Sequence, residues 1–293
     1  MTEIEEFLAS LLLTQTGSDV YEGRSPQFGW RRVFGGQLLA QSLAAAQRTI
    51  EPDRFVHSLH ACFHNPGNAA FPIRYDVART RDTRNFSSRR VVASQQDKLI
   101  ATMEASFHRD EGGPSHQEAM PLDVPRPESL PDPRDFLRSQ VSRSAKATRD
   151  LWEQPTAFDV RPVMLDHYVE RAPRRPVQRV WMRPKSPLPP DRVRNAAILA
   201  FMSDISLLGV TTFAHGVALT DPGVQFGSIS HVMWFHRPAL LDDWLLYAQD
   251  SPSSQNALGL ARGSLYAADG VLVATVVQEG LVRFVDASAR PSA

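Results

Sequence analysis

Hydrophobic and polar positions alternate along much of this 293-residue chain, and two long apolar stretches interrupt the alternation. The first half contains four alternating or β-branched runs, which predict strands at residues 56–64, 71–78, 86–95 and 99–108. The apolar stretch before them, residues 37–50, is rich in Leu and Ala and contains neither proline nor glycine, so it predicts a helix. The predicted unit of the first half is therefore one helix followed by four strands.

The same order returns in the second half. Strands are predicted at residues 160–170, 177–182, 226–235, 244–250, 258–267 and 272–284. Between the second and third of these, Pro189-Pro190-Asp191 supplies a stop and a cap for a second helix that runs through Leu208 and is closed by Gly209. Both helices are apolar nearly all round, so each is expected to be wrapped by its sheet. A sheet curled around one long helix describes a hotdog fold, and the predicted class is α+β, a double hotdog.

A direct repeat supports two copies of one unit. At an offset of 173 (262 minus 89), residues 89–107 superpose on residues 262–280, and at an offset of 172 (235 minus 63), residues 63–66 match residues 235–238. A period longer than half of the chain excludes a solenoid and indicates two fused domains. Six prolines between residues 112 and 133 interrupt every pattern and indicate an extended connection. The predicted organisation is an N-terminal hotdog (1–111), a Pro-rich connection (112–158) and a C-terminal hotdog that carries the catalytic residues (159–293).

Composition restricts the possible partners. The formal net charge is zero, so the chain has no general attraction to nucleic acid or to an anionic membrane. The first residues are acidic, and no apolar run is expected to reach the roughly 18 residues of a membrane span, so the predicted location is cytoplasmic. A single cysteine, Cys62, excludes an intramolecular disulfide and a thiolate metal cluster, and His57 and His60 are expected on opposite faces of a strand. We therefore expect no metal and no cofactor, and neither nucleic acid nor membrane as a partner.

Three polar residues of the second half stand in apolar surroundings. Asp204 lies in an apolar helical stretch, where burying a carboxylate is costly unless hydrogen bonds compensate, so such a group is retained chiefly where it is used. Gln278 lies on an alternating strand and corresponds to Ala105 of the first copy, whereas Ser228 corresponds to Val56. Each residue alone is also compatible with an ordinary polar position that faces solvent. Together they predict a site that is confined to the second half.

Several motifs carry a resemblance to a known family. They are Arg32-Val33-Phe34-Gly35-Gly36-Gln37, the strand from His57-Ser58 to Phe63, Ser203-Asp204, His231-Val232-Met233-Trp234-Phe235-His236-Arg237-Pro238, Trp244-Leu245-Leu246-Tyr247, and Asp269 to Thr275 running into Val277-Gln278-Glu279-Gly280. With these motifs the chain resembles the type II acyl-CoA thioesterases, the bacterial TesB and peroxisomal thioesterase family, across nearly its whole length. The resemblance implies a double hotdog, an acyl-CoA substrate and a homodimer or homotetramer.

The same resemblance implies a catalytic set of aspartate, threonine or serine, and glutamine, which falls on Asp204, Ser228 and Gln278. Ser228 stands where threonine is common in the family, and it retains the hydroxyl group. The expected chemistry is direct attack of water on the thioester carbonyl, with Asp204 accepting the proton of that water and no covalent acyl-enzyme. The product would be a free fatty acid and CoA.

Other residues are candidates for substrate binding. Backbone amides near Gly35-Gly36 are expected to stabilise the oxyanion at the helix N-terminus. Arginines suit the CoA phosphates, and Arg32 and Arg90 are the candidates among them, together with His57. Two alternatives stay open: a hotdog enoyl-CoA hydratase, for which the adjacent Asp166-His167 are expected to point in opposite directions, and a non-catalytic acyl-CoA-binding hotdog protein.

Overall fold

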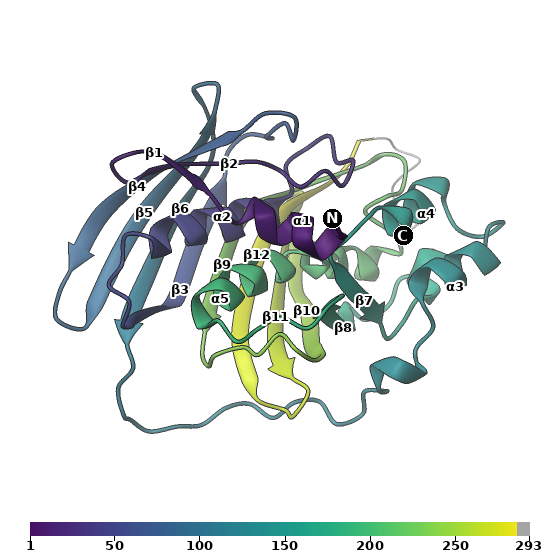
Figure 1. Ribbon diagram of the computed structural model, residues 1–293. Helices are drawn as coiled ribbons and strands as arrows, with labels where there is room; N and C mark the ends of the chain where they lie inside the picture. The colour runs from purple at the N-terminus through teal and green to yellow at the C-terminus, as the bar shows by residue number, and fades with distance from the viewer. Residues whose placement is uncertain (286–293) are drawn as a thin grey trace.

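A computed structural model describes residues 1–285, and in this range twelve strands form one antiparallel sheet (Figure 1). The strands of the first half are β1 (Thr14–Gly17), β2 (Val20–Gly23), β3 (Arg54–Phe63), β4 (Ile73–Asp82), β5 (Phe86–Gln95) and β6 (Lys98–Arg109). Those of the second half are β7 (Phe158–Pro162), β8 (Val177–Pro184), β9 (Val224–Phe235), β10 (Leu245–Gln255), β11 (Leu258–Ala267) and β12 (Leu272–Phe284). Residues 286–293 of the predicted second half lie outside the described part of the chain.

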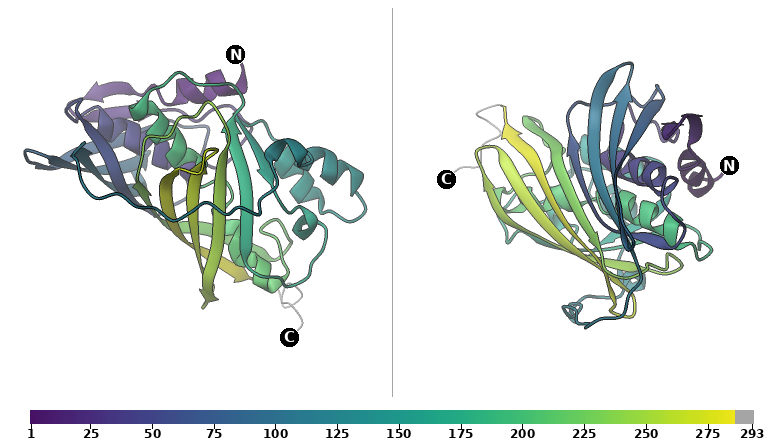
Figure 2. Two further views of the ribbon diagram at one scale, coloured as in Figure 1. Left: turned by 90° about the horizontal axis from the view of Figure 1, so that it is seen from below. Right: turned by 90° about the vertical axis from the view of Figure 1, so that its left-hand side faces the viewer.

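The order of strands in the sheet is β1-β2-β4-β5-β6-β3-β9-β12-β11-β10-β8-β7. Read inwards from its two ends, this order matches β1 with β7, β2 with β8, β4 with β10, β5 with β11, β6 with β12 and β3 with β9. The two halves are therefore related by a pseudo-twofold axis between β3 and β9. Two helices, α2 (Gly35–Gln47) and α5 (Arg192–Met202), contact each other and lie against the curved sheet (Figures 1 and 2). The predicted double hotdog is confirmed.

The two helices are antiparallel and very close. A Cβ atom on Gly36, at the start of α2, would lie 2.5 Å from the carbonyl oxygen of Phe201, near the end of α5, so only glycine permits this approach. At the other end, Gln47 Nε2 donates to the carbonyl oxygen of Val193, at 3.0 Å. The first turn of each helix therefore faces the last turn of the other.

Strand pairing defines how the two copies correspond. Val56 pairs with Phe107, and Ser228 pairs with Gly280, and in both halves one bulged residue follows on the same strand. Equivalent residues of β3 and β9 are therefore 172 apart (228 minus 56), and those of β6 and β12 are 173 apart (280 minus 107). The predicted equivalence of Val56 with Ser228 is retained in the sheet.

One part of the predicted repeat alignment is wrong. Ala105 pairs with Arg89, whereas its counterpart Gln278 pairs with Ala261, so β5 and β11 correspond at an offset of 172 (261 minus 89) rather than 173. Counted between paired residues, the loop from Tyr266 to Leu272 is one residue longer than the loop from Ser94 to Leu99. This extra residue accounts for the change of offset from 172 to 173. Because a slip of one residue moves a side chain to the other face of a sheet, Arg262 matches Arg90 and not Arg89. Arg89 is accordingly buried and Arg262 exposed.

Two predicted elements of the second half end earlier than expected. The strand predicted at 160–170 is the short β7, followed by the single-turn 3₁₀ helix η2 (Asp166–Tyr168). The helix predicted to continue through Leu208 ends at Met202, where the backbone changes to tighter bonds such as Ile205 N–H to Met202 O, at 3.1 Å. A turn at residues 203–206 and the 3₁₀ helix η3 (Leu207–His215) follow. Asp204 therefore lies just beyond a helix end rather than inside a helix.

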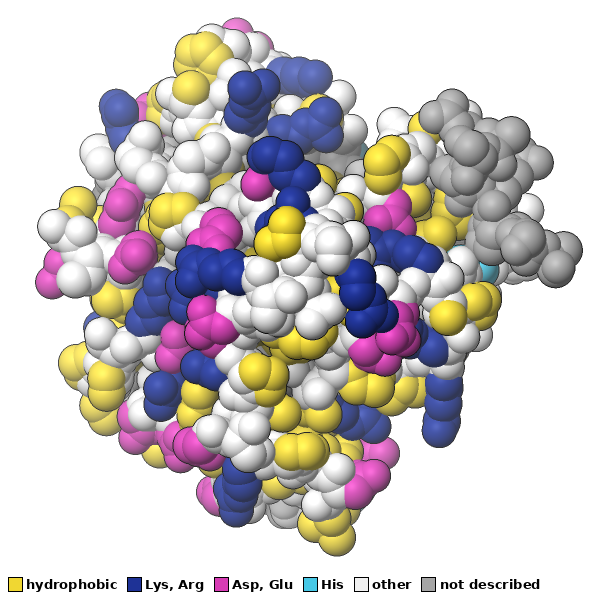
Figure 3. All heavy atoms as spheres, turned by 90° about the vertical axis from the view of Figure 1, so that its right-hand side faces the viewer, with side chains coloured by type: hydrophobic (Ala, Val, Ile, Leu, Met, Phe, Trp, Pro, Cys, Tyr) yellow, Lys and Arg dark blue, Asp and Glu magenta, His cyan; other side chains and the backbone are white. Residues whose placement is uncertain are grey.

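Elements outside the two repeat units pack onto the body of the fold: Phe7 of α1 packs against Phe158 and Phe201, and Met120 and Val124 pack against Trp181, Trp244 and Tyr266 of the sheet. The N-terminal helix α1 (Glu3–Ser10) begins with a capping box between Thr2 and Glu5. Residues 110–126 contain no helix or strand, and η1 (Pro127–Ser129), α3 (Pro133–Ser139) and α4 (Lys146–Glu153) follow before β7. Figure 3 shows the face that includes this end of the molecule, on which basic and acidic side chains are intermixed. Arg138 of α3 and Glu153 of α4 form an ion pair at 2.8 Å.

One helical stretch has the length and composition of a membrane span. It comprises Arg192–His215, that is α5, the following turn and η3, and 78% of its apolar window is buried inside the fold. The expectation that no apolar run reaches this length is therefore wrong. Because η3 packs against β10, β11 and β12, the stretch is apolar because it forms part of the protein core.

Candidate active site

The site is built around Asp204, which lies at the end of α5. Its Oδ1 accepts a hydrogen bond from Gln278 Nε2 at 2.7 Å. Its Oδ2 lies against the start of α2, so close that a Cβ atom on Gly35 would be 2.7 Å away, and the nearby backbone N–H of Gly36 lowers the pKa of the carboxyl group. No side chain of its own caps the N-terminus of α2. Asp204 of the second half therefore supplies the negative group that this helix end favours.

Gln278 joins the carboxylate to a hydroxyl group. It is fully buried on β12, and its Nε2 also donates to Ser228 Oγ on β9 at 2.8 Å. Because both amide hydrogens are used, the Ser228 hydroxyl accepts one bond and keeps its own proton for another acceptor. The three residues predicted as the catalytic set are therefore joined through one amide group.

The environment of Asp204 changes its acidity. Burial raises the pKa of this carboxyl group from 3.8 to about 7, and the hydrogen bonds from Gln278 and from the Gly36 amide oppose the rise. Near neutral pH the group can therefore both accept and return a proton. A pKa close to the working pH is the property that a general base requires.

The other substrate-binding candidates lie in the loop before α2 and on strands β3 and β5. Arg32 is exposed in the loop before α2, and Arg90 is exposed on the outer face of the sheet, 3.7 Å from Glu104. His57 is the bulged residue of β3, and its neighbour Ser58 pairs with Trp234. Trp234 is six positions from Ser228 along β9, which corresponds to roughly 20 Å. The structure thus brings Gly35 and Gly36 to Asp204, whereas Arg90 and His57 lie away from it and Arg32 is exposed three residues before Gly35.

Two buried polar residues stood in the family motifs but were given no role by sequence reasoning. His231 and Ser203 are both fully buried, and Ser203 Oγ lies 2.9 Å from His231 Nε2. Ser203 immediately precedes Asp204, and His231 pairs across the sheet with Gln278. The repeat contained a usable signal, because the counterpart of His231 in the first half is the apolar Leu59.

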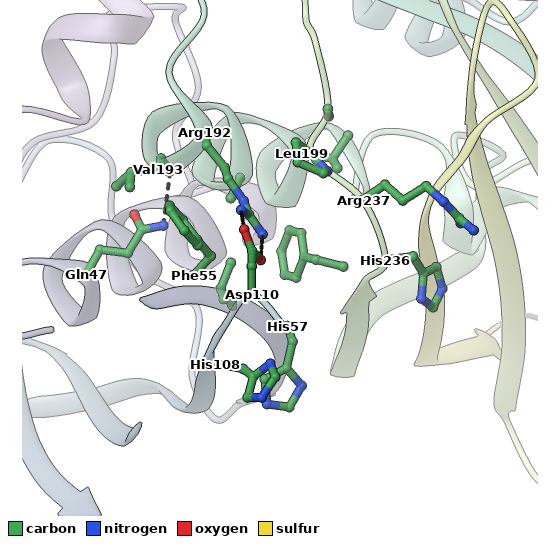
Figure 4. Close-up of a pocket in the computed structure, with 15 residues that line it drawn as sticks. Gln47, Phe55, His57, His108, Asp110, Arg192, Val193, Leu199, His236 and Arg237 are labelled. Atoms are coloured by element: carbon green, nitrogen blue, oxygen red, sulfur yellow. Dashed lines mark hydrogen bonds and ion pairs between the residues drawn. The ribbon is translucent and has the colours of Figure 1, made fainter. Parts of the chain in front are cut away.

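A cavity of about 160 Å³, lined by residues of both halves, occupies the pseudo-symmetric position at the other end of the helix pair (Figure 4). Its wall includes Val56, the counterpart of Ser228, and Arg192 at the first turn of α5. The Arg192 guanidinium pairs with Asp110 at 2.8 Å and lies 3.6 Å from the centre of the Phe55 ring. The counterpart of Gln278 is Ala105, so this end of the helix pair has neither the amide nor the hydroxyl group of the site.

The fold and the site together define a class of protein. A double hotdog that brings a helix N-terminus, a buried carboxylate, an amide and a hydroxyl group to one point is the arrangement expected of a hotdog thioester hydrolase. Comparison with known proteins identifies the family within that class.

Two family models match the chain: an acyl-CoA thioesterase N-terminal domain at residues 22–108, and an acyl-CoA thioesterase domain at residues 149–281. The chain is 34% identical to acyl-CoA thioesterase 2 of Haemophilus influenzae over 97% of its own length and 99% of that protein. It is 33% identical to human acyl-coenzyme A thioesterase 8, over 93% and 87% of the two chains. The crystal structure of the acyl-CoA thioesterase II TesB2 from Mycobacterium marinum is 38% identical, with a TM-score of 0.78 and coverage of 97% and 98%.

The chain belongs to the type II, TesB-like family of acyl-CoA thioesterases and is a thioester hydrolase. The resemblance stated from its motifs is confirmed. A hotdog protein from Alicyclobacillus acidocaldarius, 21% identical with a TM-score of 0.74, shows that the double hotdog is shared beyond close relatives.

Proposed function

We propose that this enzyme hydrolyses fatty acyl-CoA thioesters to a free fatty acid and CoA by direct attack of a water molecule held by Asp204, Ser228 and Gln278. The observation that supports the proposal most strongly is the Gln278 amide, which bridges the Asp204 carboxylate and the Ser228 hydroxyl in a buried position. Three groups that can hold one water are present at one end of the helix pair, and the other end has no such set.

In the proposed reaction, the oxygen of the water adds to the thioester carbonyl carbon while Asp204 takes one of its protons. The tetrahedral intermediate then collapses, the carbon–sulfur bond breaks, and Asp204 returns the proton to the thiolate of CoA. Ser228 and Gln278 orient the water. Because the start of α2 lies against Asp204, we assign stabilisation of the oxyanion to the positive field of the α2 N-terminus.

Release of CoA provides the direct test. The free thiol would be measured for the purified enzyme with a panel of acyl-CoAs of increasing chain length, in parallel with the Asp204→Asn variant. We expect turnover by the wild type and its loss in the variant. If neither protein releases thiol from any acyl-CoA while both bind them, a non-catalytic acyl-CoA-binding protein would be the better description.

The direct-water step has its own test. Rapid quenching followed by mass spectrometry would detect an acyl group on the protein, and we expect none on Ser228, Asp204 or Cys62. An acyl adduct that forms and decays at the rate of turnover would contradict the mechanism.

No specific observation favours the hydratase alternative. Asp166 and His167 lie in η2 rather than on a strand, and Asp166 pairs with Arg174 at 2.8 Å. We also propose that the protein is cytoplasmic and, from the family resemblance alone, that it is a homodimer or homotetramer. Size-exclusion chromatography with light scattering would measure the oligomeric state.

A further inference from the structure

The turn at residues 203–206, which carries Asp204, is held by three buried side chains of the sheet. His231 on β9 bonds to the Ser203 hydroxyl at 2.9 Å, and the hydroxyl of Tyr247 on β10 donates to the carbonyl oxygen of Ser203 at 2.9 Å. Gln249, also on β10, donates to Ser206 Oγ at 2.6 Å. The turn is therefore attached to the sheet on both sides of the proposed general base.

These anchors belong mostly to the second half. The tyrosine is common to both copies, because Tyr75 pairs with Ala93 as Tyr247 pairs with Leu265. In the first half, the counterpart of His231 is Leu59. The hydroxyl of Tyr75 donates to Gln41, on the uninterrupted helix α2, at 2.6 Å.

Two more changes accompany the altered turn. Gln249 pairs with Gly263 where the first half pairs Val77 with Val91. The glycine is required, because a Cβ atom on Gly263 would lie 2.3 Å from the ring of Tyr247. The second half has thus lost apolar packing at the positions where its helix is interrupted and its carboxylate is presented.

The hydrogen-bond pattern determines the form of His231. Ser203 Oγ donates its proton to the carbonyl oxygen of Ala200, at 2.8 Å. It must therefore accept from His231, which places the ring proton on Nε2. Burial lowers the pKa of His231 to about 3, so the ring is neutral at any pH at which the enzyme is assayed.

We infer that His231 is a positioning residue for the proposed reaction: its Nε2–H fixes Ser203, and through Ser203 it fixes Asp204 between Gln278 and the first turn of α2. The inference rests on the proposed role of Asp204. A displacement of about 1 Å in a reacting group can cost on the order of 100-fold in rate, so losing this anchor should lower kcat more than it raises KM.

The experiment compares His231→Leu with His231→Gln. Leucine reproduces the first copy and removes the donor, whereas the glutamine amide can place an N–H close to the position of Nε2. We expect kcat to fall by about 10- to 100-fold for His231→Leu, with KM changed by less than about three-fold, and to recover most of the loss for His231→Gln. Leu59→Ala, at the corresponding position of the first half, serves as a control that lowers stability without touching the turn.

The pH profile supplies a readout that a merely structural role would not change. Two titratable side chains pack beside the turn, His231 and Tyr247, and neither titrates between pH 5 and 9, because burial lowers the pKa of the first to about 3 and raises that of the second well above 10. The hydrogen bonds from Gln278 and Gly36 lower the pKa of Asp204. If His231→Leu loosens them, the acid limb of kcat should move to higher pH, whereas in Leu59→Ala it should stay in place.

Ser203→Ala tests the same bond from the turn side and remains informative if His231→Leu does not fold. Combined with His231→Leu, it should add little further loss, because both changes remove one interaction. Wild-type kcat and an unmoved acid limb in folded His231→Leu and Ser203→Ala would overturn the inference. An active Asp204→Asn variant would instead overturn the proposed general base, so the two failures are distinguishable.

Discussion

The two ends of the antiparallel helix pair were built from one ancestral pattern and now differ in how each helix begins. At one end α5 is capped by its own Asp191, whose side chain accepts from the backbone N–H of Arg194 at 2.9 Å. At the other end α2 begins without a side-chain cap, and Asp204 of the other half occupies its first turn. An uncapped helix end is a local cost in stability. In this protein the end without a cap of its own is the one against which Asp204 lies, whereas the self-capped end carries the cavity shown in Figure 4.

Corresponding contacts of the two halves still show what the copies share. His64 lies 2.9 Å from Thr102, and its repeat partner His236 lies 2.8 Å from Thr275. Contacts of this kind maintain the shared scaffold. Differences between the copies lie on the inner face of the sheet: Ser228, His231 and Gln278 of the second half replace Val56, Leu59 and Ala105, whereas the buried Arg89 of the first half matches Ala261. The two copies thus share a scaffold, and the polar groups of the proposed site are present in the second copy alone.

The largest expected effect comes from removing the carboxylate. Asp204→Asn should lower kcat by about 100-fold or more, because the amide has nearly the same shape but cannot accept a proton at neutral pH. Asp110→Asn, at the cavity end, is the matched control and should leave hydrolysis within about two-fold of wild type. Steady-state thiol release measures both, and equal losses in the two variants would remove the distinction between the ends.

A second change converts the active end to the chemistry of the other. Ser228→Val combined with Gln278→Ala reproduces Val56 and Ala105 and should lower kcat by about 100-fold, because the water loses two of its three partners. Circular dichroism would establish that the sheet is intact. Substantial hydrolysis by this double variant would mean that the first half contains an active site of its own.

The pH dependence should report Asp204 directly. Because the pKa of the carboxyl group is raised to about 7 and only its ionised form accepts a proton, kcat should fall about ten-fold per pH unit below pH 7. Above that pH it should reach a plateau. A rate that stays constant down to pH 5 would show that the titrating base is a different group.

The smallest expected effect is on stability. Folding raises the pKa of Asp204, so the folded chain holds this proton more tightly than the unfolded chain. That contribution is complete below about pH 4 and is lost as the pH rises through about 7. Asp204→Asn avoids the loss, so its free energy of unfolding should exceed that of wild type by about 1–3 kcal/mol at pH 8, with a smaller or reversed difference at pH 4.

Urea unfolding at the two pH values measures this difference, and Asp110→Asn again provides the contrast. A hydrogen bond from Arg192 lowers the pKa of Asp110, so removing its charge should give no gain at pH 8. A gain of equal size in both variants would indicate a general effect of net charge rather than the burial of Asp204.

The sequence alone determined the elements and the repeat. Alternation at residues 86–95, 258–267 and 272–284 matches the bounds of β5, β11 and β12, because period-two burial is written locally in each strand. Comparing the copies position by position singled out Gln278 and Ser228, since each has an apolar partner. Family motifs led to the thioesterase assignment, which the comparisons confirm.

Only the tertiary structure decided how these parts meet. Apolarity continues from α5 through η3, so the pattern could not reveal that the helix ends at Met202; side chains from β9 and β10 hold the turn that follows. The residues next to Arg90 and His57 in the sequence do not indicate on which face or at which end of the sheet these two side chains lie. The sequence also could not show that α2 begins against Asp204, because that contact joins residues about 170 positions apart. It depends on how the two helices pack, and long-range burial rather than local sequence determines that packing.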